Sequence, residues 1–450
     1  MMRASHRTGA ALILVLWAIA VLSLVAGGLS FAIRQDLAIA NIERYRIVAH
    51  CLARAGVEQA IASVVDDAAS FDASDSLIDT WCDDPLAMQQ IELTGGSFSV
   101  IADGHEPTST PWYGASDESA KLNLNVATRE QLLKLPDMTE PIAAAIIDWR
   151  DRDEEAEPDG IERGHYASLA HPYEIRNGAF RTVRELLLVR GVTPELFYGE
   201  DRNVNGLLET NEDDGTTSEP DDNGDGRLDR GWYAYVTIYS YEKNVNGTGE
   251  DRLKLNKASE QELTTRLHLE SWAAKSIIKA REKKKFEHLV DLLDVKRDPS
   301  IRRDADAEDE YYFRADDEQD QPVTQTIFQQ IVDDLTLKDE QILWGRINVN
   351  TAPEVVLNTL PGMDEDLAET IVRDRDARGG YTSIGQLLDV KGVTKETFGK
   401  FEEAITVRSN VFRIWSQGDA ASGLAQATIE CVVDRSGDAP RVLYWLESSP

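Results

Sequence analysis

The residues whose types and spacing are best suited to bind a ligand lie in an acidic segment, residues 200–231. The twelve-residue calcium loop, with side-chain oxygens at alternate positions and glycine at the sixth, is matched by Asp201, Asn203, Asn205, Gly206 and Glu212. Alternate oxygens converge on one cation only if the chain turns sharply, which glycine permits. The sequence therefore predicts a calcium site formed by the side chains of Asp201, Asn203, Asn205, Glu209 and Glu212 and the backbone carbonyl of Leu207.

A second, weaker match to the calcium loop follows in the same segment. Its members are Asp221, Asn223, Asp225, Gly226, Arg227 at the seventh place and Asp229 at the ninth. The twelfth residue is Trp232, so this loop lacks the closing bidentate carboxylate. An acidic surface loop without an ion is the alternative for both matches. We favour calcium, in a structural role, because carboxylates at this density repel one another without a cation.

Apart from these candidate cation loops, the sequence contains no motif that is typical of an enzyme. It has no G-x-S-x-G, H-E-x-x-H, phosphate-binding glycine loop or C-x-x-C motif. Asp148 and Asp151, like Asp374 and Asp376, stand beside arginines near predicted helix ends, and we expect surface ion pairs there. We therefore expect a protein that is not an enzyme.

The element that precedes all of these residues is an uncharged apolar stretch, residues 10–33, with Arg3, His6 and Arg7 before it. At about 1.5 Å per residue, a helix of this length crosses a hydrocarbon core of roughly 30 Å. The basic residues on its amino-terminal side predict a single-pass membrane protein with a cytoplasmic amino terminus and the rest of the chain outside the cytoplasm. Apolar residues continue at helical spacing to about Val65, which predicts one long helix.

A short basic leader that ends in Gly9, followed by an apolar helix that continues as an amphipathic one, resembles the start of type IV pilins and pseudopilins. The resemblance implies that a prepilin peptidase cuts between Gly9 and Ala10. Most pilins carry Glu at the fifth mature position, which is Leu14 here. Members of the general secretion pathway protein K family lack this Glu, and ALILVLWAIAVLSL is similar to their start. Hydropathy alone leaves an ordinary signal anchor open as the alternative.

Strand patterns occur at both ends of the remaining chain. Two alternating runs around Gly95 and Gly96 predict a β-hairpin, and three further strands are expected at 411–417, 425–434 and 441–447. The fold class is therefore α+β: a long helix on a small antiparallel sheet, interrupted by a large, mostly helical insertion. The expected parts are a leader (1–9), a membrane helix (10–33), helix and first strands (34–116), the insertion (117–408) and closing strands (409–450). Cys82 and Cys431 are the pair we would expect in a disulfide, which leaves Cys51 over.

The insertion contains three similar copies, near residues 121–198, 253–297 and 347–401. Each has an asparagine, expected to cap a helix, then a leucine-rich helix, a short turn and a second helix that ends in arginine. This pattern resembles the helix-hairpin-helix modules of DNA-binding proteins. Of the three core turns only Pro361-Gly362 keeps a glycine, and Asp364 follows it. With a net charge of −33, we expect no nucleic acid partner.

The resemblance implies a minor pseudopilin of a type II protein secretion system, which forms or caps the pseudopilus tip and helps export folded proteins across the outer membrane. The implied partners are other minor pseudopilins of the tip complex, the inner-membrane secretion platform and the prepilin peptidase. Two alternatives stay open. They are a membrane-anchored helix-hairpin-helix DNA receptor and a calcium-stabilised anchored scaffold outside any filament.

Overall fold

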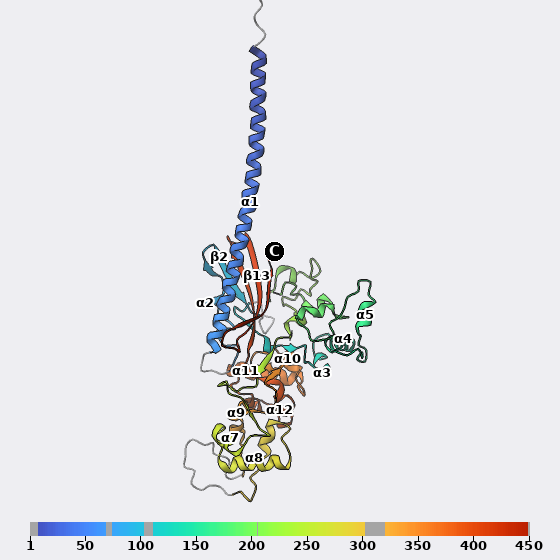
Figure 1. The fold of residues 1–450 in the computed structure, drawn as a ribbon, viewed down its shortest axis with the longest axis vertical. Coiled ribbons are helices and arrows are strands. Elements are labelled where there is room, and N and C mark those ends of the chain that lie inside the picture. The colour runs from blue at the N-terminus through green and yellow to red at the C-terminus, as the bar shows by residue number, and fades with distance from the viewer. Residues whose placement is uncertain (1–7, 69–73, 103–110, 205, 302–319, 449–450) are drawn as a thin grey trace, which may run out of the picture.

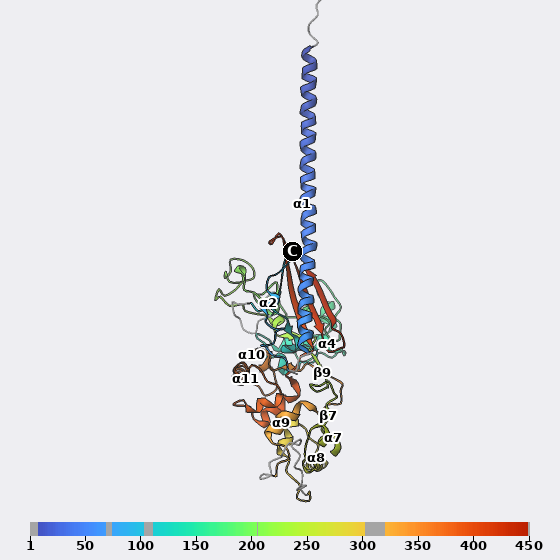
Figure 2. The ribbon, with the colours of Figure 1, turned by 90° about the vertical axis from the view of Figure 1, so that its left-hand side faces the viewer.

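The computed structural model describes residues 8–68, 74–102, 111–204, 206–301 and 320–448. Its longest element is helix α1 (Thr8–Ala68), 61 residues in one unbroken run. The first half of α1 projects away from the rest of the molecule, and the second half lies against a sheet (Figures 1 and 2). It is the one described helix that is long and apolar enough to cross a membrane. The long helix expected from the sequence is confirmed.

The sheet joins the two ends of the chain. Its order is β1-β2-β12-β13-β14, with β3 paired to β12, and every pairing is antiparallel. The strands are β1 (Ile91–Leu93), β2 (Gly96–Ile101), β3 (Ser116–Asp117), β12 (Val411–Ala420), β13 (Ala425–Asp434) and β14 (Arg441–Ser448), and the short helix α2 (Pro85–Met88) precedes β1. The expected hairpin and closing strands are confirmed, and so is the α+β fold class.

Glycines allow α1 to lie close against the sheet. A Cβ at Gly418 would come within 2.1 Å of the carbonyl oxygen of Ala49, and one at Gly56 within 2.3 Å of the Ser416 hydroxyl. Cys82 and Cys431 lie in one domain, as expected, and are buried in the core beneath this contact. Both are free thiols, so the expected disulfide is not formed.

Three helical units make up the insertion between β3 and β12. The helices and strands are β4 (Leu122–Asn123), α3 (Arg129–Leu132), α4 (Glu140–Arg150), α5 (Arg163–Ala167), α6 (Pro194–Tyr198), β5 (Val236–Thr237), β6 (Tyr241–Lys243), β7 (Leu253–Lys254), α7 (Glu260–Arg266), α8 (Ser271–Lys283), α9 (Gln325–Ile331), β8 (Leu335–Thr336), β9 (Ile342–Trp344), β10 (Ile347–Asn348), α10 (Glu354–Asn358), α11 (Glu365–Arg378), α12 (Lys395–Phe401) and β11 (Ile405–Thr406). Short 3-10 helices are η1 (Glu118–Ala120), η2 (Val183–Leu188), η3 (Thr210–Glu212), η4 (Trp232–Ala234), η5 (Leu289–Asp294), η6 (Val332–Asp334), η7 (Ile384–Asp389) and η8 (Glu402–Ala404).

Each unit opens and closes with a pair of two-residue parallel strands: β4 with β5, β7 with β8, and β10 with β11. The second unit, with α7 and α8, lies farthest from α1 (Figure 1). The third unit, with α10 to α12, lies between it and the sheet, and the first unit extends to one side (Figure 1). The three units share one continuous apolar core, separate from the core beneath α1.

The asparagines of the copies do not cap helices, so that prediction is wrong. Thr128 and Ser259 cap α3 and α7 instead, each in a capping box. Each asparagine side chain instead hydrogen-bonds to the backbone of an aromatic residue that follows the second helix of its copy. Asn350, for example, donates to the carbonyl of Tyr381 (2.8 Å) and accepts from its N–H (2.7 Å), and Asn125 and Asn256 bind Phe180 and Phe286 in the same way.

The arginine that ends the second helix has the same role in all three units. Arg150, Arg281 and Arg375 each donate to a backbone carbonyl at the start of their own unit, for example Arg281 Nη1 to Leu255 O at 2.9 Å. A guanidinium has five donors in a planar fork, which suits several carbonyls at once. The repeated Asn and Arg are thus structural parts of the unit.

Candidate cation loop and the domain junction

The first acidic loop folds around its own carboxylates. The backbone N–H of Gly206 donates to Oδ2 of Asp201 (2.9 Å), which is the sharp turn expected at the sixth position. The N–H of Glu209 donates to Oε2 of Glu212 (3.0 Å), and Nδ2 of Asn203 donates to Oε2 of Glu209 (3.1 Å). Hydrogen bonds therefore join the first position of the loop to the sixth, the third to the ninth, and the ninth to the twelfth.

Two carboxylates of this loop are buried. Asp201 is 7% exposed and Glu212 is 1% exposed. Burial, together with the negative charges of Asp201 and Glu209, raises the pKa of Glu212 to about 7. A hard divalent cation would favour the ionised form, and oxygen ligands of this kind are those that calcium takes. The residues fit calcium. Leu207 lies in the described turn, and Asn205 lies outside the described residues.

The second acidic loop uses its polar atoms within itself. Nδ2 of Asn223 donates to Oδ2 of Asp229 (2.9 Å), and Oδ1 of Asn223 accepts from the N–H of Asp225 (2.9 Å). Asp221 is exposed, and the side chain of Arg227 lines a cavity of about 790 Å³ beside the third unit. This loop therefore brings the expected third and ninth positions together.

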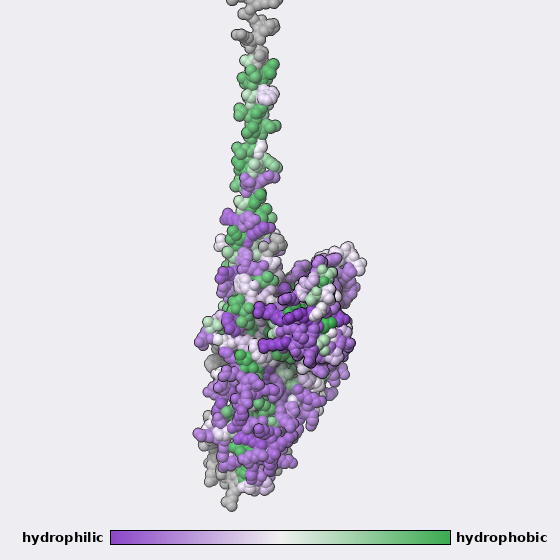
Figure 3. Space-filling model, turned by 45° about the vertical axis from the view of Figure 1, so that its right-hand side comes forward, coloured by the Kyte–Doolittle hydropathy of each residue, from purple (hydrophilic) through white to green (hydrophobic). Residues whose placement is uncertain are grey.

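The residues of the expected leader lie at the start of α1. Gly9 and Ala10 are within the helix, and Leu14 is 70% exposed. Apolar side chains cover this half of α1, whereas the surface of the body is mainly hydrophilic (Figure 3). An exposed apolar helix of this length is stable only where lipid or other apolar helices cover it.

The sheet and the third helical unit meet at a buried carboxylate that local sequence patterns do not reveal. Asp117 is 2% exposed, and its Oδ2 accepts from Nδ2 of Asn348 (3.1 Å) and from the hydroxyls of Thr351 and Ser409. Its Oδ1 accepts from the N–H of Ser119 (2.6 Å). Burial raises the pKa of Asp117, and these hydrogen bonds oppose that rise. The Asp117 side chain thus hydrogen-bonds to residues near both ends of the insertion.

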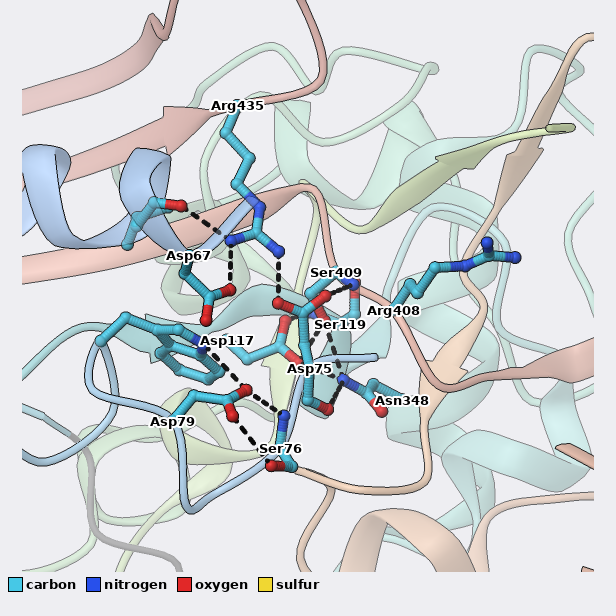
Figure 4. A network of polar contacts seen from close by, with 12 residues as sticks. Asp67, Asp75, Ser76, Asp79, Asp117, Ser119, Asn348, Arg408, Ser409 and Arg435 are labelled. Carbon is cyan, nitrogen blue, oxygen red and sulfur yellow. Dashed lines mark hydrogen bonds and ion pairs between the residues drawn. The ribbon is translucent and has the colours of Figure 1, made fainter. Parts of the chain in front are cut away.

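A second carboxylate, Asp75, ties the end of α1 to the same junction (Figure 4). It pairs with Arg435, and its Oδ2 accepts from the N–H of Ser409 (2.7 Å). Arg435 also pairs with Asp67 near the end of α1 (2.9 Å). Burial raises the pKa of Asp75 to about 7, although Arg435 lowers it. The helix, the sheet and the insertion therefore meet in one network.

The first helical unit is fixed to the sheet by a third network. Arg413 of β12 donates to Glu118 (2.7 Å) and Glu430 (2.6 Å), and all three side chains are buried. Arg184 pairs with Glu430 (3.1 Å), and Tyr233 bonds to both Arg413 and Glu430. Burial would raise the pKa of Glu118, but Arg413 lowers it below its ordinary value. Sequence reasoning missed these residues because their partners lie far apart along the chain.

Of the ion pairs expected at helix ends, those of the third unit are confirmed. Asp374 pairs with Arg378 (2.6 Å) and Asp376 with Arg375 (3.1 Å). The expectation for Asp148 and Asp151 is wrong. Asp148 is fully buried, and no ion pair within 4.0 Å joins either carboxylate to a basic side chain in the described part of the chain.

The third hairpin turn is engaged within the molecule. Lys134 of the first unit donates to the carbonyl of Met363 (3.4 Å) and to Asn358 (3.3 Å). Asp364 caps α11, because its Oδ1 accepts from the N–H of Leu367 (2.9 Å). A carboxylate therefore occupies the helix start at which a phosphate would be bound by backbone N–H groups.

A long apolar helix on an antiparallel sheet, with helical repeats inserted between the strands, defines a pseudopilin-like chain. Residues 114–199 match the family described as Type II secretion system (T2SS), protein K, and residues 344–406 match the helix-hairpin-helix motif. The resemblance to the type II secretion system protein K family that the sequence indicated is therefore confirmed over the first helical unit.

Similar proteins include one of known structure. A chain of the GspK-GspI-GspJ complex from the enterotoxigenic Escherichia coli type 2 secretion system aligns over 93% of this chain and 99% of that chain, with a TM-score of 0.43 and 15% identity. Short segments resemble endonuclease/exonuclease/phosphatase family domain-containing protein 1, at 46% identity over 48 residues in Danio rerio and 40% over 67 residues in Mus musculus. These segments are 11% and 14% of this chain and span 9% and 12% of those relatives.

Proposed function

We propose that the chain is a minor pseudopilin that forms or caps the tip of a type II secretion pseudopilus and so helps export folded proteins across the outer membrane. The observation that carries the proposal is the combination in α1 of an exposed apolar half with a half packed on the sheet. Such a helix can pass from lipid into a bundle of similar helices at little cost, because apolar packing replaces apolar lipid. The match of residues 114–199 to the protein K family supports this role.

The proposed location is the inner membrane, with residues 10–33 in the bilayer, the amino terminus in the cytoplasm and the body in the periplasm. A prepilin peptidase would cut between Gly9 and Ala10 before assembly. The basic residues before the apolar stretch support this orientation.

A tip position follows from Leu14 and from the bulk of the insertion. A buried carboxylate in an apolar bundle needs a partner, which in a filament the neighbouring subunit's new amino terminus would provide. Leu14 cannot make that contact. The three helical units also widen the molecule beside and beyond the sheet (Figure 1). Other minor pseudopilins and the inner-membrane platform are the proposed partners.

The capping role is tested by counting copies per filament. Cells that assemble pseudopili would carry the wild type, Leu14→Glu or the control Leu14→Ala, and sheared pseudopili would be analysed by quantitative mass spectrometry. We expect about one copy per filament for the wild type and the control, and more for Leu14→Glu. Copies of the wild type spread in proportion to filament length would contradict a tip position.

We further propose that the loop from Asp201 to Glu212 binds calcium in a structural role and orders the acidic segment. The buried pair Asp201 and Glu212 and the turn at Gly206 support this. Limited proteolysis of the detergent-solubilised chain should cut residues 200–231 faster in a chelator than in calcium. Glu212→Gln should be cut fast in both, and equal protection of wild type and variant would contradict the proposal.

A DNA receptor is the second candidate, because residues 344–406 match the helix-hairpin-helix motif. Asp364 at the start of α11 and the net charge of −33 both oppose phosphate binding. Retention of DNA by the solubilised chain, lost with rising salt, would support this candidate. A calcium-stabilised anchored scaffold would show neither DNA retention nor leader processing.

A further inference from the structure

A polar cavity of about 210 Å³ lies where the insertion meets the end of α1 and the sheet. Its walls come from the residues after β6, the linker between β11 and β12, the last turn of α1 and the turn after β13. Polar residues of its lining include Lys243, Asn246, Arg408, Asn410, Arg435 and Ser436. The cavity borders the network around Asp75, but its lining extends well beyond that network.

Arg408 is the unusual member of this lining. Its side chain is 16% exposed, and its Nη2 is inaccessible to solvent and has no hydrogen-bond partner. In the part of the chain that the structure describes, its guanidinium makes no hydrogen bond, and its one ion pair, with Glu242, is 3.5 Å long. The side chain extends away from Asp75 and Arg435 (Figure 4). A guanidinium has five N–H donors, and a buried donor without an acceptor is costly.

The carboxylate of Glu242 is already engaged by two other arginines. Its Oε1 accepts from Nη2 of Arg252 (2.6 Å), and its Oε2 accepts from Nη1 of Arg346 (2.9 Å). Burial would raise the pKa of Glu242, but Arg252, Arg346 and Arg408 lower it to about 2. Glu242 is therefore ionised, and one negative charge is shared among three guanidinium groups.

The other carboxylates beside the cavity do not balance Arg408. Asp67 and Asp75 are both paired with Arg435. Burial raises the pKa of Asp333 above its ordinary value, and the charge of Arg408 only partly opposes that rise. The guanidinium of Arg408 is thus a buried cation whose donors have no acceptor among the described residues.

Further donors line the same cavity. Lys243 is exposed and donates to the carbonyl of Ser436, and Nδ2 of Asn410 makes only a long contact of 3.4 Å to the carbonyl of Tyr241. A guanidinium, an ammonium, an amide and a hydroxyl are the donors that recognise carboxylate and phosphate groups. Because one water occupies about 30 Å³, the cavity has room for one such group and a few waters.

The second helical unit shows how a cation at the equivalent position is normally satisfied. The N–H of Arg408 donates to the hydroxyl of Thr406, and the N–H of Lys338 donates in the same way to that of Thr336, each at 3.1 Å. The Lys338 side chain is 48% exposed and pairs with Glu403 (2.8 Å). The second unit therefore provides its cation with a partner at the surface, whereas the third unit buries a cation without such a partner.

We propose that the cavity binds one small oxyanion, phosphate or a carboxylate, with two of its oxygens on the guanidinium of Arg408. A planar guanidinium presents paired donors that match such a group. The anion would lie between the linker before β12 and the end of β6, and so would stabilise the junction between the insertion and the sheet. The site depends neither on pseudopilus assembly nor on calcium.

The amount of anion bound per chain is the direct test. Equilibrium dialysis of the full chain in a nonionic detergent would use labelled phosphate or labelled acetate, with sodium chloride to hold the ionic strength constant. We expect the wild type and the matched control Lys338→Gln to bind one anion. Arg408→Gln should bind at least about tenfold more weakly, because charge-assisted hydrogen bonds are lost. If the wild type binds neither anion, or if Arg408→Gln binds as the wild type does, the proposal is overturned.

Thermal unfolding shows whether the variants are folded and provides a second readout. In chloride alone, Arg408→Gln should unfold at no lower a temperature than the wild type, because a buried charge without a close partner is gone. Millimolar phosphate should raise the unfolding temperature of the wild type and Lys338→Gln but not that of Arg408→Gln. Lys243→Gln, a change at an exposed side chain, should show a reduced shift even if Arg408→Gln does not fold. Equal shifts in all of these proteins would be a general salt effect and would overturn the site.

Discussion

Two groups of buried carboxylates in this molecule differ in how their charge is balanced. At the domain junction, Glu118 and Asp75 are paired with Arg413 and Arg435. In the first helical unit, Asp148 and Glu162 have buried oxygens with no hydrogen-bond partner. Arginines of the chain therefore neutralise the carboxylates of the junction, whereas no ion pair joins Asp148 or Glu162 to a basic side chain among the described residues. The predictions below test this difference.

The largest effect is expected from Arg413→Met, which leaves Glu118 and Glu430 buried without their cation. Removing one partner of a buried ion pair costs about 3–5 kcal/mol. Urea unfolding of the solubilised chain measures the loss, which should be the same with and without calcium. Arg441→Met is the control, because the Arg441 side chain is 69% exposed and its buried partner Asp434 keeps its hydrogen bonds from the Tyr241 hydroxyl and the N–H of Ser436. A loss below about 1 kcal/mol for Arg413→Met would show that the network does not hold the units together.

Removal of calcium should have the next largest effect. A ligand that binds only the folded state at 100 times its dissociation constant stabilises by about 2.7 kcal/mol. Chelation should therefore lower the unfolding temperature of the wild type, and magnesium should restore it poorly because it requires a smaller, octahedral site. An unfolding temperature unchanged by chelator would contradict calcium binding by the loop from Asp201 to Glu212.

The pH dependence of stability should reveal Asp75. Folding raises its pKa from about 3.8 to about 7, so the stability it contributes is present at low pH and is lost as pH rises through that interval. The free energy of unfolding of the wild type, minus that of Asp75→Asn, should therefore fall between about pH 4 and pH 7. A difference that is flat over this range would mean that Asp75 is ionised throughout.

Exposed ion pairs should matter least. Lys395 pairs with Asp294 between the third and second units, and both side chains are largely exposed. Solvent screens such a pair, so Lys395→Ala should change the free energy of unfolding by less than about 1 kcal/mol. A larger loss in urea unfolding would show that this exposed pair stabilises the contact between the two units. The difference from the buried Arg413 network would then be smaller than expected.

Features with a local pattern were predictable from the sequence. Apolar spacing predicted α1 to within a few residues, and alternation predicted β12 to β14, because both periods follow from backbone geometry. The networks around Arg413 and Arg435 were not predictable, since their partners come from distant elements. Asn350 was misread for a similar reason: its partner, Tyr381, lies beyond a whole helical hairpin.

Asp148, Asp151 and Glu162 lie together in the first helical unit, and the sequence contained a signal for this that was missed. From Asp151 to Glu162 acidic residues recur at alternate positions, as in a calcium loop, but glycine stands at the tenth place and not the sixth. The arginines beside Asp148 suggested ion pairs instead. Only the folded unit shows that Arg150 turns to the backbone carbonyls and leaves Asp148 unpaired.

The central claim, that this chain is assembled as a pseudopilin, is tested most directly by the amino-terminal sequence of the protein recovered from membranes of cells that contain the prepilin peptidase. We predict a start at Ala10 with the apolar helix retained, and an uncut amino terminus in a Gly9→Ala variant. An intact Met1 in the wild type, or a cut beyond Ile33, would contradict the account and leave an anchored or secreted repeat protein.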